Sequence, residues 1–234
     1  MNVCYAQDRG PHWPRAVVFD LDGTLVDSIG DLADALNATF AGRGLPQLPE
    51  ARIKEFVGAG ISELVRRGLL ESGVAEDDLE NCIADMLERY SARPVARTRL
   101  YDGAAELLAS LRGAGVKLGV CTNKPQRITE TVLEALGIAA HFGAIIGECP
   151  ARPRKPDPAM LRAVLDALEV AAFDALMVGD SGSDVSVARA LGMPVIVLRS
   201  GYGRDTPEDL GADRVIGSLR ETEDVIAALR IGAP

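Results

Sequence analysis

Residues 17–28 read Val-Val-Phe-Asp-Leu-Asp-Gly-Thr-Leu-Val-Asp-Ser, and this stretch decides the fold of the chain. Its apolar start is typical of a buried strand, and Gly23 lets the chain turn directly after two carboxylates, Asp20 and Asp22. Carboxylates at the end of a buried strand are costly unless a cation meets them. A hard divalent ion such as Mg²⁺ suits this place, or one carboxylate can attack phosphorus. On this stretch alone, a plain acidic turn at Asp22-Gly23 stays open.

Length and composition favour a globular protein with a sizeable hydrophobic core. The chain has 234 residues, of which 47% are hydrophobic. It carries 34 acidic against 25 basic residues, which gives a net charge of −9, and it has no long cluster of Lys and Arg. We therefore expect neither nucleic acid nor an anionic membrane as a partner.

Cysteine usage and the N-terminal segment favour a cytoplasmic protein. Cys4, Cys82, Cys121 and Cys149 are widely spaced, so they indicate neither a disulfide framework nor a zinc site. Residues 1–14 lack the basic region and apolar core of a signal peptide, and we interpret them as a loose leader. No apolar run approaches the roughly 20 residues that a membrane helix needs, so we expect no membrane span.

Residues 28–98 have the pattern of an all-helical insert after the first strand, which we expect over residues 16–21. Ser28 with Asp31 predicts a capping box at the first helix of the insert. Apolar residues then recur at helical spacing in three stripes, with glycines and prolines between them. These stripes are Ile29, Leu32, Ala33, Leu36 and Phe40; Ile61, Leu64, Val65 and Leu69; and Leu79, Ile83, Met86, Leu87 and Tyr90.

From Leu100 onward the sequence alternates between helical and strand patterns. Such alternation predicts right-handed crossovers and a parallel sheet with helices on both faces. The expected fold class is therefore α/β, a three-layer α/β/α Rossmann-like core of residues 15–27 and 99–234, with residues 28–98 inserted as a small all-helical domain. We expect helices at 102–111, 125–136, 158–168, 183–191 and 219–229, and strands at 116–121, 144–146, 175–178, 194–198 and 214–216.

Polar side chains follow four of the predicted strands. Ligands of parallel α/β sheets bind at the carboxyl ends of the strands, so these side chains are candidates for one site. They are Asp20 and Asp22 after the first strand, Thr122 and Asn123 after residues 116–121, Lys155 after residues 144–146, and Asp180 and Asp184 after residues 175–178.

Each of these residues also has a plainer interpretation. Thr122 can cap the next helix, and Lys155 can be a solvated surface lysine. Asp180 and Asp184 can be the N-cap and the first-turn acid of the helix that follows them. Independent caps would not supply a nucleophile, a hydroxyl, a cation and further metal ligands at successive strand ends. We therefore predict that the set forms one functional site.

Together the motifs resemble the four signatures of the haloacid dehalogenase-like superfamily, spread over nearly the whole chain. The resemblance implies that residues 28–98 are a helical cap domain. It also implies that the first strand is central, between the strands of Cys121 and Val178. The motifs are Asp20-Leu21-Asp22-Gly23-Thr24, Thr122-Asn123, Lys155, and Gly179-Asp180-Ser181 with Asp184.

The resemblance implies a phosphomonoester hydrolase that forms an aspartyl phosphate. Asp20 would attack phosphorus. Asp22 would give a proton to the leaving alcohol and later take one from water, and neighbouring carboxylates would keep it protonated near neutrality.

The same resemblance implies a set of ligands for Mg²⁺ and for phosphate. Mg²⁺ would bind the side chains of Asp20 and Asp180 and the main-chain carbonyl of Asp22, with Asp184 as a ligand or just behind one. The phosphoryl oxygens would be held by Thr122, the backbone of Asn123, and Lys155.

Within the superfamily, the chain resembles the phosphoglycolate phosphatases most closely, which implies 2-phosphoglycolate as the substrate. Asp22 disfavours the true dehalogenases, which lack an Asp there. Residues 148–153 and Gly203 depart from the phosphoglycolate phosphatase pattern, and they bear on the substrate rather than on the chemistry. The matching segments are residues 25–28, 56–60, 122–125, 155–158 and 201–203.

Several alternatives stay open at this point. The substrate can be another small sugar or acid phosphate, or the protein can be a sugar-phosphate mutase of the same fold. A non-catalytic phosphate-binding protein or a receiver-like signalling protein belongs to a different class, but receivers are shorter and lack a helical insert. Gly58 and Gly60 either contact the phosphate from the insert or only separate two helices. A monomer and a homodimer are both expected possibilities.

Overall fold

The strand predicted from the opening stretch lies third in a six-stranded sheet, in which all paired strands are parallel. The structure is a computed structural model that describes residues 10–75 and 78–231. As the family resemblance implied, the first strand lies between the strands of Cys121 and Val178. In spatial order the strands are β5 (Ala144–Glu148), β4 (Lys117–Pro125), β1 (Ala16–Phe19), β6 (Ala175–Gly179), β7 (Val195–Leu198) and β8 (Arg214–Ile216).

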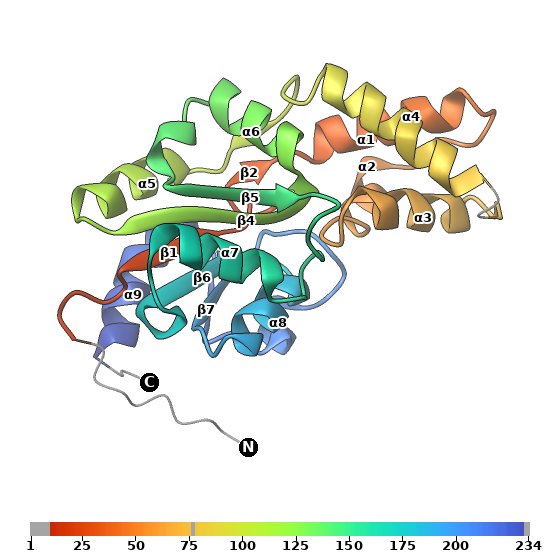
Figure 1. Cartoon of the computed structure of the whole chain (residues 1–234). Coiled ribbons are helices and arrows are strands. Elements are labelled where there is room, and N and C mark those ends of the chain that lie inside the picture. The colour runs from red at the N-terminus through yellow and green to blue at the C-terminus, as the bar shows by residue number, and fades with distance from the viewer. Residues whose placement is uncertain (1–9, 76–77, 232–234) are drawn as a thin grey trace.

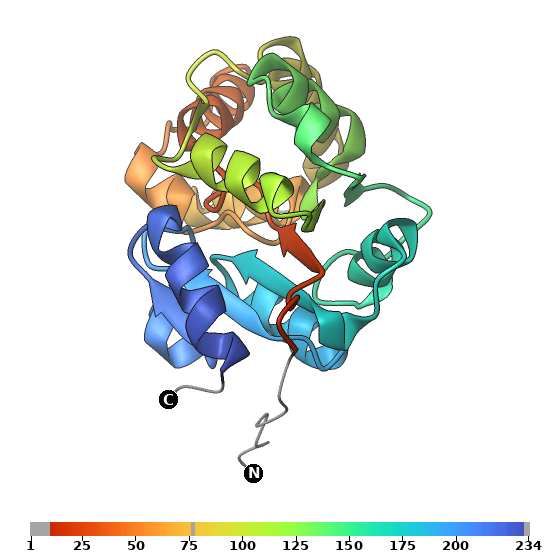
Figure 2. The ribbon, with the colours of Figure 1, turned by 90° about the vertical axis from the view of Figure 1, so that its left-hand side faces the viewer.

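Helices cover both faces of this sheet (Figures 1 and 2). The helices are α5 (Ala104–Gly113), α6 (Gln126–Ala135), α7 (Ala159–Leu168), α8 (Gly182–Ala190) and α9 (Thr222–Arg230), with 3-10 turns η2 (Ala139–His141), η3 (Ala172–Asp174), η4 (Pro207–Leu210) and η5 (Leu219–Glu221). On β1, Val17 and Phe19 share a hydrophobic cluster with α5, α6 and α9, whereas Ala16 and Val18 share another with α7 and α8. Alternate strand residues point to opposite faces, so the expected three-layer α/β/α core is confirmed.

The segment between β1 and α5 is mainly helical, as expected. Its helices are α1 (Ile29–Ala41), α2 (Glu50–Lys54), α3 (Ile61–Glu71) and α4 (Leu79–Ala92), and Figure 1 shows them beyond the tips of the strand arrows. The predicted apolar stripes face inward, since Leu36, Leu64 and Met86 are all buried. Their hydrophobic cluster is continuous with the α5, α6 and α9 side of the sheet.

A short antiparallel ribbon carries the chain into and out of this helical segment. It consists of β2 (Val26–Asp27) and β3 (Arg99–Leu100), which pair with each other. The sequence did not predict the ribbon, because two residues per strand are too few to show an alternating pattern. It also did not predict α2, which is only five residues long.

The capping box predicted at Ser28 and Asp31 is wrong. Ser28 Oγ donates to Asp22 Oδ1 at 2.6 Å instead of capping α1. Asp31 accepts hydrogen bonds from the backbone N–H groups of Arg97 and Thr98, at 2.8 to 3.0 Å, and so fixes the exit of the helical segment. The box was predicted from local spacing, but Ser28 turns back to Asp22, and Asp31 binds residues that are distant in the sequence.

Two strand boundaries differ from those expected in a way that shapes the site. β1 ends at Phe19, so Asp20 lies just beyond the last ladder residue. β4 runs on to Pro125, and its register with β5 shifts between Cys121 and Pro125. Thr122 and Asn123 therefore lie on an irregular strand end rather than in a loop.

Trp13 of the expected leader packs against the folded part of the chain. Of the expected leader, residues 1–9, which include Cys4, lie outside the described residues, while Trp13 is buried and its indole N–H donates to the carbonyl of Phe173 at 3.1 Å.

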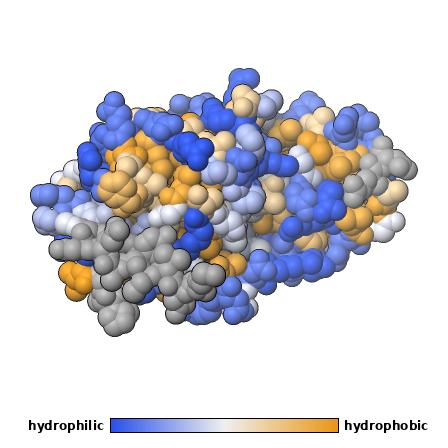
Figure 3. Space-filling model, turned by 60° about the horizontal axis from the view of Figure 1, so that its bottom comes forward, coloured by the Kyte–Doolittle hydropathy of each residue, from blue (hydrophilic) through white to orange (hydrophobic). Residues whose placement is uncertain are grey.

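Hydrophobic areas on the face in Figure 3 are broken up by hydrophilic residues. Within residues 10–75 and 78–231, no helix combines the length and the apolar character that crossing a bilayer requires.

The close packing of α7 against β4 generates a stability prediction. A Cβ atom added at Gly119 of β4 would lie 2.4 Å from Val164 Cγ1 of α7, so the helix would have to move. We expect Gly119→Ala to lower the free energy of unfolding by about 1–3 kcal/mol in urea titrations. Gly113→Ala is the control, because nothing lies within 4 Å of its Cβ position in α5, and it should be neutral or slightly stabilising. Equal stabilities of the two variants would contradict this packing.

Candidate active site

The carboxyl ends of four adjacent strands meet at one site. Asp20 follows β1, Asp180 follows β6, Thr122 lies near the end of β4, and Lys155 lies in the connection from β5 to α7. One carboxylate oxygen from each of Asp20, Asp180 and Asp184 lies within 4.8 Å of the other two, and all three residues are buried. The structure thus brings together residues spread over most of the chain; their chemical roles remain predictions.

Lys155 is the cation of this cluster. Its side chain is buried, and Nζ lies 3.0 Å from Asp20 Oδ1 and 2.7 Å from Asp184 Oδ1. Nζ also donates to the carbonyl oxygen of Cys121 at 2.8 Å. The interpretation of Lys155 as a solvated surface lysine is therefore wrong, and Cys121 is a buried strand residue.

Asp184 combines the capping role with a place in the cluster. Its Oδ2 accepts hydrogen bonds from the N–H groups of Asp180 and Ser181 and from Ser181 Oγ, at 3.2, 3.1 and 2.7 Å. Ser181 and Asp184 form a capping box at the start of α8. Because Oδ1 binds Lys155, both oxygens of Asp184 have protein partners. Asp184 thereby holds Lys155 and the backbone of Asp180 in place.

Asp180 is held by two further segments. Its Oδ1 accepts from Thr24 Oγ1 at 3.1 Å, and its Oδ2 accepts from the N–H of Tyr202 at 2.7 Å. A Cβ atom at Gly23 would lie 2.2 Å from Asp180 Oδ2, and one at Gly201 would lie 2.2 Å from Asp180 Cβ. Glycine at these two positions lets both turns close on this carboxylate.

Burial of the carboxylates shifts their titration strongly. Desolvation raises the pKa of Asp20 to about 6, opposed by the Lys155 ammonium and assisted by the Asp184 carboxylate. Desolvation, followed by the charges of Asp20 and Asp184, raises the pKa of Asp180 well above its usual range. Burial alone would lower the pKa of Lys155, but Asp184 and Asp20 outweigh it and raise that pKa.

The cluster has the chemistry that a divalent cation requires. Lys155 is its one ammonium, so three ionised carboxylates would leave it with excess negative charge. Asp20 Oδ1 is in ion-pair range of Lys155, but the contact lacks hydrogen-bond alignment, and this buried atom has no hydrogen-bond partner within the part of the chain that the structure describes. Oxygen donors with unmet charge fit Mg²⁺, which binds carboxylates together with water and phosphate oxygens.

A small cavity lies above the cluster, between the sheet and the helical segment. It has a volume of about 30 Å³. Its lining residues come from both parts of the chain: Asp20, Asp22, Leu32, Val57, Gly58, Gly60, Ile61, Leu64, Tyr90, Thr122, Asn123 and Lys124. The predicted residues Thr122, Asn123, Gly58 and Gly60 thus share one cavity with Asp20 and Asp22.

Asn123 links the turn at Gly58 in the helical segment to the α/β core by hydrogen bonds. Its Nδ2 donates to the carbonyl oxygens of Gly58 and Lys155, both at 3.1 Å, and its Oδ1 accepts from the N–H of Lys155 at 2.9 Å. Gly58 and Gly60 have φ values of 119° and 89°, which glycine adopts readily. The turn therefore precedes α3 and also lines the cavity, and its contact with phosphate stays a prediction.

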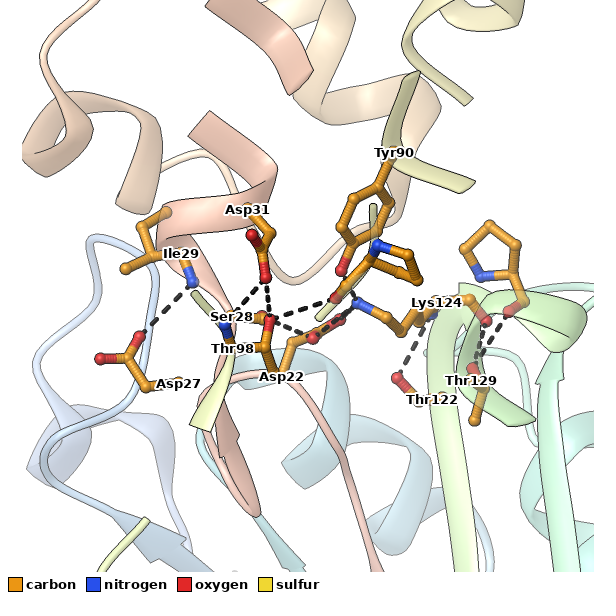
Figure 4. A network of polar contacts seen from close by, with 12 residues as sticks. Asp22, Asp27, Ser28, Ile29, Asp31, Tyr90, Thr98, Thr122, Lys124 and Thr129 are labelled. Carbon is orange, nitrogen blue, oxygen red and sulfur yellow. Dashed lines mark hydrogen bonds and ion pairs between the residues drawn. The ribbon is translucent and has the colours of Figure 1, made fainter. Parts of the chain in front are cut away.

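Asp22 has different neighbours from those expected. The Lys124 ammonium lies 2.9 Å from its Oδ1 and 3.1 Å from its Oδ2, and Ser28 donates to the same carboxylate (Figure 4). Lys124 also donates to the hydroxyl of Tyr90 on α4. We expected carboxylates around Asp22, but its charged contact in the described residues is this cation.

Sequence reasoning missed Lys124, Tyr90 and Tyr202. Lys124 directly follows the Thr122-Asn123 motif, which is a signal that could have been used, whereas Tyr90 only continued an apolar stripe. The Tyr202 hydroxyl accepts from the N–H groups of Ser28 and Ile29 and donates to Asp27 Oδ1 at 2.7 Å. It joins the loop after β7 to the start of α1.

Comparison with known proteins agrees with this geometry. The family model described as "Haloacid dehalogenase-like hydrolase" matches residues 17–198. A protein of Rhodospirillum rubrum named phosphoglycolate phosphatase is 46% identical over 217 residues, or 90% of each chain. One of the same name from Chromobacterium violaceum is 39% identical over 91% of this chain and 96% of its own. A crystal structure described as a predicted phosphoglycolate phosphatase from Haemophilus somnus superposes with a TM-score of 0.84 at 27% identity, covering 92% of this chain and 98% of its own.

The raised pKa of Asp20 generates a prediction about stability without metal. The folded protein holds the Asp20 proton more tightly than the unfolded chain, so this contribution to stability is present at acid pH and is lost as the pH rises through about 6. The test, done with a metal chelator present, compares the free energy of unfolding of the unmodified protein with that of Asp20→Asn. The unmodified protein should lose about 2 kcal/mol relative to the variant between about pH 4.5 and pH 7.5. The control is Asp209→Asn, because Asp209 is exposed; its free energy of unfolding should change with pH in the same way as that of the unmodified protein. A constant difference from Asp20→Asn across this range would contradict the burial effect.

Proposed function

The chain belongs to the haloacid dehalogenase-like hydrolases and is a phosphatase, and we propose that its substrate is 2-phosphoglycolate. In this proposal Mg²⁺ is the cofactor, and the phosphoryl group passes through an aspartyl phosphate on Asp20. The observation that carries the proposal is the position of Asp20: it is buried, it lines the cavity, and one of its oxygens has no hydrogen-bond partner among the described residues. This oxygen lies 3.0 Å from the Lys155 ammonium, and a metal ion or a phosphoryl group would meet its remaining bonding capacity.

The carboxylate cluster is the proposed metal site. Asp20 and Asp180 would hold Mg²⁺ with their side chains, and Asp22 with its main-chain carbonyl. Asp184 would support the site from behind, because both of its oxygens already have protein partners. Bound Mg²⁺ would supply the positive charge that lets a phosphoryl group enter this acidic cluster.

The phosphoryl oxygens would meet donors from two strand ends. Thr122 lines the cavity beside Asp20, and Lys155 Nζ lies 3.0 Å from Asp20 Oδ1. Thr122, the backbone N–H of Asn123, and Lys155 would stabilise the charge that the transferring group carries. Asp20 would attack phosphorus, and the bond to the leaving oxygen would break.

Asp22 is the proposed acid and base. It lines the same cavity as Asp20 and follows it by two residues on the same turn. Asp22 would protonate the leaving oxygen of glycolate, and it would then take a proton from the water that attacks the phosphoryl group on Asp20. Ser28 and Lys124 fix the position of its carboxylate.

Residues 28–98 are proposed to act as a cap over a core of residues 15–27 and 99–234. Supporting this, Leu32, Gly58, Leu64 and Tyr90 of the helical segment line the cavity that contains Asp20. A cap that covers the site keeps water from the reacting group and suits a small substrate. We further propose a cytoplasmic location for the protein, and a small phosphorylated metabolite as its only partner at this site.

A substrate panel tests the proposed activity. In the presence of Mg²⁺, we expect release of inorganic phosphate from 2-phosphoglycolate with a higher kcat/KM than from sugar phosphates or 3-phosphoglycerate. Chelation should abolish release, and added Mg²⁺ should restore it, because the carboxylate cluster then lacks its counter-charge. Full activity in chelator would contradict the metal site. A higher kcat/KM for a sugar phosphate would contradict the substrate.

Two substitutions test the assigned chemistry. Asp20→Asn removes the nucleophile with little change of shape and should reduce turnover by about 10³-fold or more. Asp22→Asn should either be inactive or accumulate phosphoenzyme, which intact-protein mass spectrometry would detect as one added phosphoryl group. Asp209→Asn serves again as the control and should keep full turnover. Steady-state hydrolysis at the normal rate by Asp20→Asn or by Asp22→Asn would contradict the role assigned to that residue.

A further inference from the structure

Lys124 and Tyr90 place two hydrogen-bond donors in the cavity wall beside Asp22, and neither is among the residues proposed to hold the phosphoryl oxygens. The Lys124 side chain is only 1% exposed, yet the residue lines the cavity. The Tyr90 hydroxyl accepts from Lys124 (Figure 4), and among residues 10–75 and 78–231 we find no hydrogen bond that this hydroxyl donates. A buried donor without a partner is costly, so an acceptor supplied by a ligand would satisfy it.

The rest of the cavity wall favours a small ligand with one negative charge at this end. Lys124 is the only Lys or Arg among the residues that line the cavity. Leu32, Ile61 and Leu64 supply apolar surface from the helical segment. The Lys124 ammonium is shared with Asp22, and together with the Tyr90 hydroxyl and the apolar side chains beside it, it forms a place for a small carboxylate rather than for a neutral, extended sugar.

The position of Lys124 relative to Asp22 fits a carboxylate close to the leaving oxygen. In the proposed function Asp22 contacts that oxygen, and Lys124 Nζ lies 2.9 Å and 3.1 Å from the two Asp22 oxygens. In 2-phosphoglycolate a single carbon separates the ester oxygen from the carboxylate. A group bound by Asp22 through its ester oxygen therefore brings its carboxylate next to Lys124.

We infer that Lys124 and Tyr90 bind the carboxylate of the substrate's leaving group and thereby select carboxylate-bearing phosphomonoesters. This inference rests on the proposed function, because it takes Asp22 as the contact of the leaving oxygen. It gives α4 of the helical segment a direct part in specificity: Tyr90 completes the carboxylate site only where α4 packs over the sheet.

The test compares two substrates that differ in this group alone. 2-Phosphoglycolate carries the carboxylate, and 2-hydroxyethyl phosphate carries a neutral hydroxymethyl group in its place. The ratio of their kcat/KM values, measured with Mg²⁺, is the readout. Lys124→Met removes the charge with little loss of volume, and Tyr90→Phe removes only the hydroxyl. Lys54→Met is the control, since Lys54 lies outside the cavity lining and donates to the carbonyl oxygen of Ser200.

We expect the unmodified protein and Lys54→Met to prefer 2-phosphoglycolate. Lys124→Met should lower that preference by about 10- to 100-fold, as expected for the loss of a hydrogen-bonded charge, and Tyr90→Phe should lower it by a smaller factor. An equal loss on both substrates in Lys124→Met would show that Lys124 acts only through Asp22, and this result would overturn the inference. If Lys124→Met does not fold, an unchanged preference in Tyr90→Phe would overturn it.

The same measurements distinguish failure of the substrate assignment from failure of the role inferred for Lys124. If the unmodified protein hydrolyses both compounds equally well, the assignment of 2-phosphoglycolate fails, and the carboxylate site fails with it. If the unmodified protein prefers 2-phosphoglycolate and Lys124→Met keeps that preference in full, the substrate assignment stands and only the role of Lys124 is overturned.

Discussion

Three carboxylates buried around a single lysine are the constraint on which this structure depends. Asp20, Asp180 and Asp184 are each within reach of the others, and Lys155 contacts two of them. Burying so much like charge is unfavourable, and it raises the pKa values of Asp20 and Asp180. A divalent cation and a phosphoryl group held between these residues and their neighbours would turn the unfavourable cluster into a binding site.

The parallel sheet brings the residues of this cluster together at the ends of neighbouring strands. Parallel strands carry Asp20, Thr122 and Asp180 to the same edge of the sheet, and the capping box of α8 positions Asp184 behind them. The helical segment closes the cavity from above and meets the core through Asn123 and Lys124. One set of contacts thus holds the carboxylate cluster, and a second set joins the helical segment to the sheet beside the cavity.

Much of this arrangement could be predicted from the sequence, because strand ends of a parallel sheet must converge and the motifs lie at those ends. The errors came from side-chain contacts that the pattern of a single helix or strand does not encode. Ser28 was predicted to cap α1, but it bonds Asp22 instead. Lys124 and Tyr90 were missed, since their pairing depends on where α4 places Tyr90 relative to the end of β4, which no local pattern encodes. The two-residue strands β2 and β3 were too short to leave a signal.

A crystal structure grown with Mg²⁺ and tetrafluoroaluminate, a planar mimic of the transferring phosphoryl group, would show whether the buried carboxylates hold a metal ion beside Asp20. We expect Mg²⁺ at about 2.1 Å from side-chain oxygens of Asp20 and Asp180, with aluminium in line with the other Asp20 oxygen and its fluorides facing Thr122 and Lys155. If Mg²⁺ and the mimic bind away from Asp20, and that carboxylate stays paired only to Lys155, the cluster is not the phosphoryl-transfer site.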